Sequence, residues 1–238
     1  MARLPLRAEL FLLAHDDDTG EPHLNEQSLA VGLAGAILLE LWINRHVAIG
    51  WEINMRTQQW QQQPGTITIA TNRGVGDPLS DAAIATIRHT AYGRGGHTHL
   101  RTWLRAFAGS DLYERVRANM VTVGVLQRSS RRRALGLVKT DAYLATHDSW
   151  AVRARGLICS VMNGRDAPDE QCVALCGLLD VLELAPYLYH PGLSDQDVRR
   201  ALRRIVHHYR TEHRDPAISE VIAAVDAGRG DLAVAAMR

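Results

Sequence analysis

Four arginines in the middle of the chain have the residue type and spacing that phosphate binding requires. Arg101 and Arg105 are four residues apart, so they share one face of a predicted helix, and Arg115 and Arg117 lie on the next one. Guanidinium groups bind phosphate oxygens through parallel N–H bonds, and free N–H groups at a helix N-terminus add to such a site. We hypothesise that some of these arginines form a phosphate site; ordinary solvated arginines are the alternative, and the one we favour.

A second group of arginines belongs to a predicted β-hairpin. Val125–Arg128 and Ala134–Lys139 are predicted to pair as its strands, with Ser129–Arg133 at the tip. The arginines at or beside this tip are Arg128, Arg131, Arg132 and Arg133. They could contact phosphates of lipid or DNA, or they could keep an exposed hairpin from pairing with other chains. The sequence leaves both interpretations open.

Residues 194–213 combine a basic face with an apolar stripe. The basic side chains are Arg199, Arg200, Arg203, Arg204, His207, His208 and Arg210. Basic amphipathic helices bind anionic membrane surfaces. A solvated outer face, held on the core by the apolar stripe, explains the pattern equally simply and is the interpretation we favour.

The remaining candidates for chemistry are weak. Cys172 and Cys176 are four residues apart, but no HExxH, CxxC or GxSxG motif accompanies them, so these two and Cys159 are predicted to be reduced thiols. Gly93–Gly96 precedes a predicted helix, yet no strand leads into it and no GK[ST] follows. We expect no enzymatic activity, no metal and no cofactor.

Composition predicts one folded domain over residues 1–238. Hydrophobic residues make up 46% of the chain, and a net charge of +1 gives no overall attraction to nucleic acid or membrane. The longest apolar run, Leu29–Leu39, is too short to span a bilayer. Arg7 and Glu9 interrupt the N-terminal apolar stretch, which argues against a signal peptide. We therefore expect a cytoplasmic protein.

Periodicity predicts a mainly α fold, a compact helical domain with a short β-hairpin at about 125–139. Residues 27–44 are apolar almost all round, which is typical of a core helix, and Gly32 and Gly35 would let another helix approach closely. The other predicted helices cover 78–91, 97–108, 111–123, 147–163, 168–189, 194–213 and 216–237. Strands are predicted at 46–53 and 66–71, with an exposed loop at 56–65 between them.

Several segments together resemble the Golgi phosphoprotein 3 family in its bacterial form. The matching segments are 11–20 (FLLAHDDDTG), 32–41 (GLAGAILLEL), 76–81 (GDPLSD), 114–126 (ERVRANMVTVGVL) and 181–183 (VLE). Their order and spacing agree with the family over nearly the whole chain. The resemblance implies a non-enzymatic peripheral membrane adaptor that binds phosphatidylinositol 4-phosphate or another anionic phospholipid headgroup. It also implies cytoplasmic tails of membrane proteins as partners and self-association through the hairpin.

The chain departs from the family pattern at the lipid pocket. The family's Trp before the core helix and three basic residues fall here at Asn25, Ala34, Ser110 and Tyr113. None of these has the expected chemistry, so Arg101, Arg105, Arg115 and Arg117 become candidates for a displaced headgroup site. Two alternatives stay open: a DNA-binding regulator, because residues 111–139 outline a winged helix, and a protein-interaction domain that has lost lipid binding.

Overall fold

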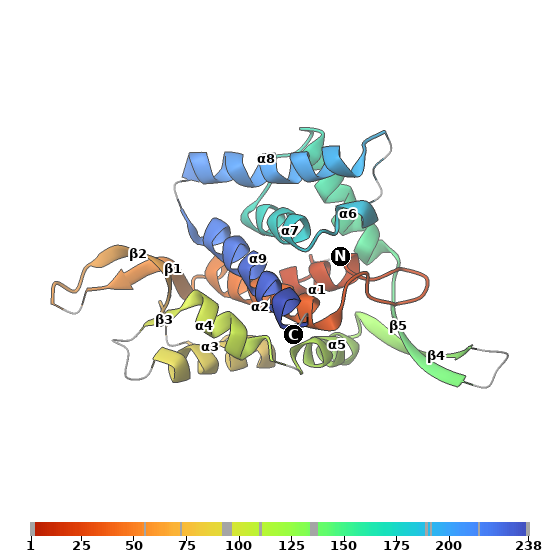
Figure 1. Ribbon diagram of the computed structural model, residues 1–238, viewed down its shortest axis with the longest axis horizontal. Coiled ribbons are helices and arrows are strands. Elements are labelled where there is room, and N and C mark those ends of the chain that lie inside the picture. Colours follow the sequence, from red (N-terminus) through yellow and green to blue (C-terminus); the bar gives the residue numbers. More distant parts are fainter. Residues whose placement is uncertain are drawn as a thin grey trace.

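The computed structural model describes residues 3–54, 56–71, 73–91, 97–109, 111–133, 138–188, 190, 192–213 and 215–236. It is mainly α-helical with two small antiparallel sheets, as predicted (Figure 1). In chain order the elements are α1 (Leu6–Leu13), α2 (Glu26–Ile43), β1 (Val47–Ile53), β2 (Trp60–Ile69), α3 (Pro78–Ala91), β3 (His97–His99), α4 (Leu100–Phe107), α5 (Leu112–Thr122), β4 (Leu126–Arg133), β5 (Val138–Ala145), α6 (Ser149–Met162), α7 (Glu170–Val181), the 3-10 helix η1 (Ala185–Tyr187), α8 (Asp195–His213) and α9 (Ala217–Ala236).

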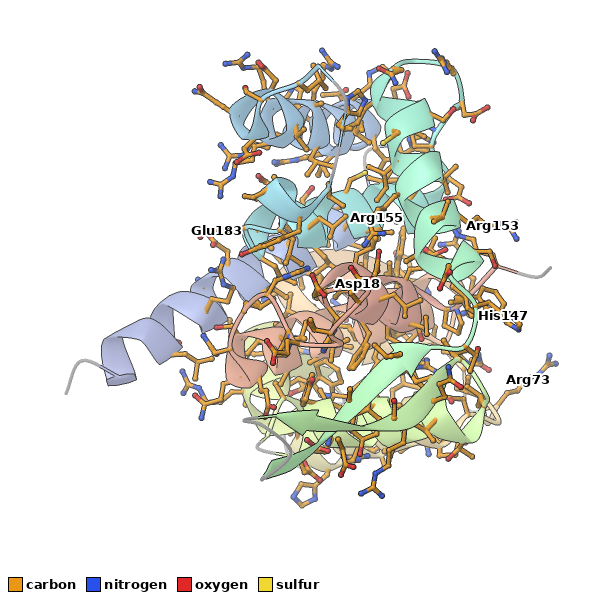
Figure 2. The ribbon with its side chains drawn as sticks, turned by 90° about the vertical axis from the view of Figure 1, so that its right-hand side faces the viewer. Asp18, Arg73, His147, Arg153, Arg155 and Glu183 are labelled. Atoms are coloured by element: carbon orange, nitrogen blue, oxygen red, sulfur yellow. The ribbon has the colours of Figure 1, made fainter. Side chains whose placement is uncertain are left out.

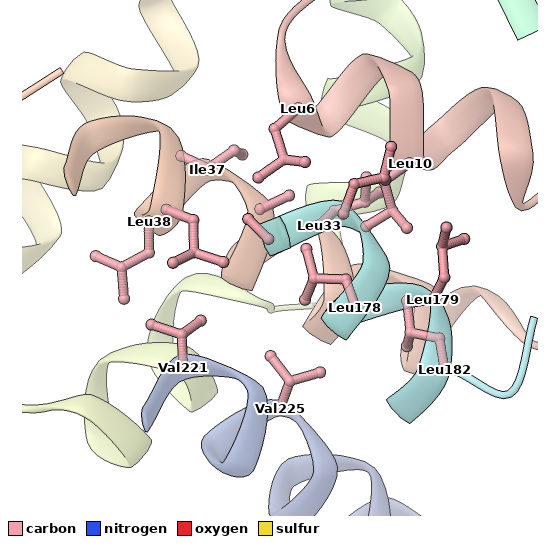
Figure 3. Close-up of a cluster of buried hydrophobic side chains, with 14 of the residues drawn as sticks. Leu6, Leu10, Leu33, Ile37, Leu38, Leu178, Leu179, Leu182, Val221 and Val225 are labelled. Carbon is pink, nitrogen blue, oxygen red and sulfur yellow. The ribbon is translucent and has the colours of Figure 1, made fainter. Parts of the chain in front are cut away.

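Helix α2 is the centre of the core, as its composition predicted. Apart from its first two residues and its last, every residue of the helix is buried. Figure 3 shows Leu33, Ile37 and Leu38 among side chains from α1, α7 and α9. By length and composition alone α2 could cross a membrane, but 83% of its residues are buried inside the protein, as in the core helix of a globular fold.

Glycines on α2 set how closely the neighbouring helices approach. A Cβ at Gly35 would lie 2.6 Å from the Cγ2 atom of Val225 on α9, and a Cβ at Gly32 would lie 2.6 Å from Leu182, just after α7. Both distances are shorter than van der Waals contact. Close packing therefore accounts for helix-interior glycines, each of which costs about 1 kcal/mol relative to alanine.

A buried ion network joins the first three helices. The Arg7 guanidinium on α1 pairs with Glu40 on α2, and the Arg7 backbone N–H donates to the same carboxylate at 2.6 Å. The guanidinium also pairs with Asp77 at 2.9 Å, and Asp77 in turn accepts from the Ser80 N–H at the start of α3. Burial raises the pKa of Glu40 to about 7, although Arg7 opposes that shift.

The three-stranded sheet corrects two predictions. Strand β2 begins at Trp60, so the predicted loop at 56–65 is wrong over its second half. Residues 60–62 pair with Trp51–Ile53, and residues 60–64 remain exposed. Because both faces of this outer part of the sheet meet solvent, its sequence lacks the alternation of apolar and polar residues that identifies a half-buried strand. His97–His99 pair with β2 as β3, so the helix predicted from residue 97 begins only at Leu100.

The bounds of the hairpin and of the helix predicted at 168–189 also differ from the prediction. Residues 129–133, predicted as the hairpin tip, extend β4 instead, and β5 runs on to Ala145. Helix α7 ends at Val181, because Glu183 adopts a left-handed φ of 59° and η1 follows. Helix α8 packs on α7 and forms the outermost layer, at the opposite edge of Figure 1 from α3, α4 and α5.

We expect Gly35→Ala to destabilise the protein by about 1–3 kcal/mol, because the new methyl group must displace Val225 in a filled core. Gly156→Ala is the matched control: this glycine is exposed on α6 with no atom near its added Cβ, so alanine should stabilise by up to about 1 kcal/mol. Urea unfolding of both variants measures the difference. A neutral or stabilising Gly35→Ala would contradict the close contact.

Glu40→Gln tests the buried network through its pH dependence. The ordinary pKa of a glutamate is 4.5, and that of folded Glu40 is about 7. Between these two pH values, Glu40 keeps its proton in the folded protein and releases it in the unfolded chain. Its contribution to stability is therefore fully present below pH 4.5 and is lost as the pH rises through 7. The unfolding free energy of wild type minus variant should fall by roughly 3 kcal/mol over this range. A constant difference over this range would contradict the assignment.

Candidate functional site

A cavity of about 370 Å³ lies where the start of α2 meets α4, α5 and α9. We call it the α4–α9 cavity. Its apolar walls come from Ala30, Val31, Leu104, Ala108, Ala224 and Leu232. Its volume falls within the range of small-molecule sites, which combine apolar walls with a few polar groups.

Helix α4 brings Arg101 and Arg105 to this cavity. Leu100, Trp103, Leu104 and Phe107 are buried at i, i+3, i+4 and i+7, so the arginines occupy the opposite, exposed face of the helix. The Trp103 indole N–H donates to the Ala83 carbonyl at 3.3 Å, which attaches α4 to α3. The sequence pattern thus predicted this pair correctly as neighbours on one helix face.

Two carboxylates on the cavity lining were missed by the sequence analysis. Glu26 comes from the first turn of α2, and Asp231 comes from α9, where it pairs with Arg105 at 3.1 Å. The lining therefore carries two positive and two negative side chains. No local motif indicates this set, because its members lie on three helices far apart in sequence.

Arg115 and Arg117 lie elsewhere. Arg115 lies over the Phe107 ring at 5.9 Å and 3.9 Å from Asp111, and it lines neither this cavity nor the next. Arg117 lies over the Tyr143 ring at 4.2 Å and also pairs with Glu114. The four arginines of the sequence hypothesis thus do not meet at one site in the structure.

Arg117 lines a smaller cavity, of about 160 Å³, between α5, β5 and the turn after α1. Gly20 in this turn has φ +70°, and a Cβ there would lie 2.6 Å from the Tyr143 carbonyl oxygen. The turn is attached to α6 as well, because Arg155 pairs with Asp17 at 2.5 Å; Figure 2 labels Arg155 on α6 and Asp18 in the turn. The acidic turn therefore has a structural role in this chain.

Tyr113 lines both cavities, as does Glu26. Its hydroxyl lies 2.9 Å from the Nε2 atom of His15, whose Nδ1 atom lies 2.6 Å from the Phe11 carbonyl oxygen. Burial lowers the pKa of His15 to about 4, so the ring is neutral at pH 7. Since Nδ1 must donate to the carbonyl, Nε2 is the acceptor and the Tyr113 hydroxyl donates to it. That hydroxyl is therefore already engaged within the protein.

The other pocket positions of the family pattern also have structural roles. Asn25 caps α2 by accepting from the Ser28 N–H at 2.8 Å, and Ala34 is completely buried. Ser110 lies outside the described residues. Asn25, Ala34 and Tyr113 therefore all have side chains that serve the fold.

The hairpin arginines are only partly described. Arg128 is exposed and pairs with Asp141 across the hairpin at 2.6 Å. Arg131, Arg132 and Arg133 belong to β4 rather than to a tip, and their side chains lie outside the described part of the structure. Contact between this hairpin and lipid, DNA or a second copy stays a prediction.

The basic helix and the cysteines take the structural positions that the sequence favoured. Val198, Leu202 and Ile205 of α8 face inward, and its exposed arginines include two that pair with Asp197 and Asp180. Cys172 and Cys176 are completely buried, and all three cysteines are free thiols. Among the described residues, no group of His, Cys, Asp and Glu has the arrangement of a metal site.

Comparison with known proteins identifies one relationship. The family model described as Golgi phosphoprotein 3 matches residues 6–227, nearly the whole chain. A search of curated proteins found no match.

Tyr113→Phe should lower the unfolding free energy by about 1–3 kcal/mol, because the buried Nε2 atom of His15 loses its only hydrogen-bond donor among the described residues. Chemical denaturation measures this loss. Tyr187→Phe is a control, since that side chain is exposed and stacks on His23 through its ring alone. Equal stability of wild type and Tyr113→Phe would contradict the proposed direction of the hydrogen bond.

Proposed function

Because the chain belongs to the Golgi phosphoprotein 3 family, we propose that it is a non-enzymatic peripheral membrane adaptor that binds phospholipid headgroups in the α4–α9 cavity. Arg101 and Arg105 are the residues proposed to contact the headgroup phosphate. The observation that carries the proposal is the placement of both arginines on a cavity that also has apolar walls. An amphiphilic molecule fits such a cavity, because its phosphate group can bind the arginines and its hydrocarbon can contact the apolar walls.

Arg101 is the stronger phosphate ligand of the two. Arg105 already pairs with Asp231, at a distance of 3.1 Å, although both side chains remain largely exposed. Among the described residues Arg101 forms no ion pair, so its guanidinium can bind a phosphate without breaking one. Exposed ion pairs contribute little energy, so Arg105 can exchange its partner at small cost.

The adaptor role and the cellular location follow the family resemblance. We propose that the protein lies in the cytoplasm and binds reversibly to the cytoplasmic face of a membrane. Cytoplasmic tails of membrane proteins are the proposed clients, and the β4–β5 hairpin is the proposed surface for self-association. Phosphatidylinositol 4-phosphate and other anionic phospholipids are the first headgroups to test, since all carry phosphate.

Flotation with liposomes tests this proposal. The bilayer matrix is an uncharged galactolipid without phosphate, to which one phospholipid is added at a time: phosphatidylinositol 4-phosphate, phosphatidylglycerol, phosphatidylethanolamine or phosphatidylcholine. The protein should float only when a phosphate-bearing lipid is present. Arg101→Gln/Arg105→Gln should lower the apparent affinity at least tenfold, roughly the loss of one charge-assisted hydrogen bond.

Arg88→Gln is the matched control, because Arg88 is exposed on α3 and lines neither described cavity. This variant should float like wild type. Unchanged flotation of the double variant would exclude the α4–α9 cavity as the headgroup site. If no liposome binds but a duplex-DNA band shifts with a steep salt dependence, the protein is a DNA-binding regulator instead.

A further inference from the structure

We infer that the α4–α9 cavity takes a zwitterionic headgroup, a phosphate joined to an ammonium group as in phosphoethanolamine or phosphocholine, in preference to a purely anionic one. This inference rests on the proposed function and names the class of lipid. It follows from the charges that line the cavity and from the Tyr113 hydroxyl, which is already engaged by His15.

The charged side chains on the cavity sum to zero. Arg101 and Arg105 contribute two positive charges, and Glu26 and Asp231 contribute two negative charges. A headgroup with several negative charges would meet both carboxylates as well as both arginines. A zwitterion has a favourable partner on the cavity for each of its two charges. For a purely anionic headgroup, the contacts with the two carboxylates are repulsive, and such like-charge contacts are a common means of rejecting the wrong ligand.

Arg101 and Glu26 are the two groups available to such a ligand. The pair Arg105–Asp231 is internally matched, whereas neither Arg101 nor Glu26 forms an ion pair among the described residues. They also come from different walls, Arg101 from α4 and Glu26 from the first turn of α2. A bound zwitterion would place its phosphate at Arg101 and its ammonium group at Glu26.

Tyr113 offers a bound phosphate no hydrogen bond on the part of the cavity that it lines. It lines the same cavity as Glu26. Burial raises the pKa of the Tyr113 phenol; the neighbouring Arg117 opposes this increase, and the Glu26 carboxylate adds to it. The Tyr113 hydroxyl donates to His15 and therefore offers a phosphate no donor, and the Arg117 guanidinium already lies over the Tyr113 ring, 5.5 Å from its centroid.

The apolar walls of the cavity can contact the hydrocarbon part of the ligand. Ala30, Val31 and Ala224 line the cavity between the charged groups, and a second, more open cavity of about 380 Å³ shares Arg101 and Ala224 with it. Arg101 thus lines both cavities along the α4–α9 contact. Hydrocarbon next to the headgroup can be buried there while the charges stay at the rim.

Single-chain amphiphiles separate headgroup charge from bilayer effects. Dodecylphosphocholine, dodecyl phosphate and dodecyl maltoside share one hydrocarbon chain and differ in headgroup, and each is titrated below its micelle concentration by isothermal calorimetry. Wild type should bind dodecylphosphocholine most tightly. Glu26→Gln should weaken that binding about tenfold and strengthen the binding of dodecyl phosphate, so the order of the two is reversed.

Two further variants complete the test. Arg101→Gln should weaken the binding of both phosphate-bearing amphiphiles, and Glu212→Gln, an exposed carboxylate on α8, should change neither. Circular dichroism and thermal midpoints show that each variant is folded; Glu26 lies on an exposed first turn, where glutamine fits the same space.

The inference is overturned if wild type prefers dodecyl phosphate, or if Glu26→Gln changes both affinities in the same direction. Either result leaves phosphate binding by Arg101, and with it the proposed function, in place. If neither phosphate-bearing amphiphile binds more tightly than dodecyl maltoside, the proposed headgroup function fails together with the inference.

Discussion

Helices α7 and α9 approach α2 closely because Gly32 and Gly35 leave no side chain between them. This contact fixes the positions of the elements around α2, and the rest of the structure depends on it. The side chains of Figure 3 fill the remaining space from α1, α7 and α9. Since interiors are packed at crystal-like density, an added methyl group at this contact has nowhere to go without moving a helix.

The same packing creates the candidate site. Helix α9 crosses α2 at Gly35 and Val225, and its last turns then run beside α4, so Asp231 and Leu232 reach the wall opposite Arg101 and Arg105. The first turn of α2 emerges from the core at the same place and carries Glu26. The cavity is therefore a consequence of where three helices leave the core.

Charged groups have two separate roles in this protein. The Arg7, Glu40 and Asp77 network lies largely inside the protein and joins α1, α2 and α3, with one guanidinium shared between two carboxyl groups. The charges on the α4–α9 cavity are exposed and only partly matched, which leaves Arg101 and Glu26 for a ligand. Tyr113, held by His15, forms the boundary between the core and this exposed set.

The sequence by itself determined the helical class, the buried α2, the start of α3 at Pro78 and the amphipathic faces of α4 and α8, because each depends on local periodicity or capping. It also placed Arg101 and Arg105 on one helix face. The tertiary structure alone decided that Arg115 and Arg117 lie apart from them and that Glu26, Tyr113 and Asp231 share their cavity. Contacts between helices distant in sequence leave no local pattern. The exposed β2 arm and the left-handed Glu183 were missed for a related reason, since strand pairing and core packing, rather than local propensity, set them.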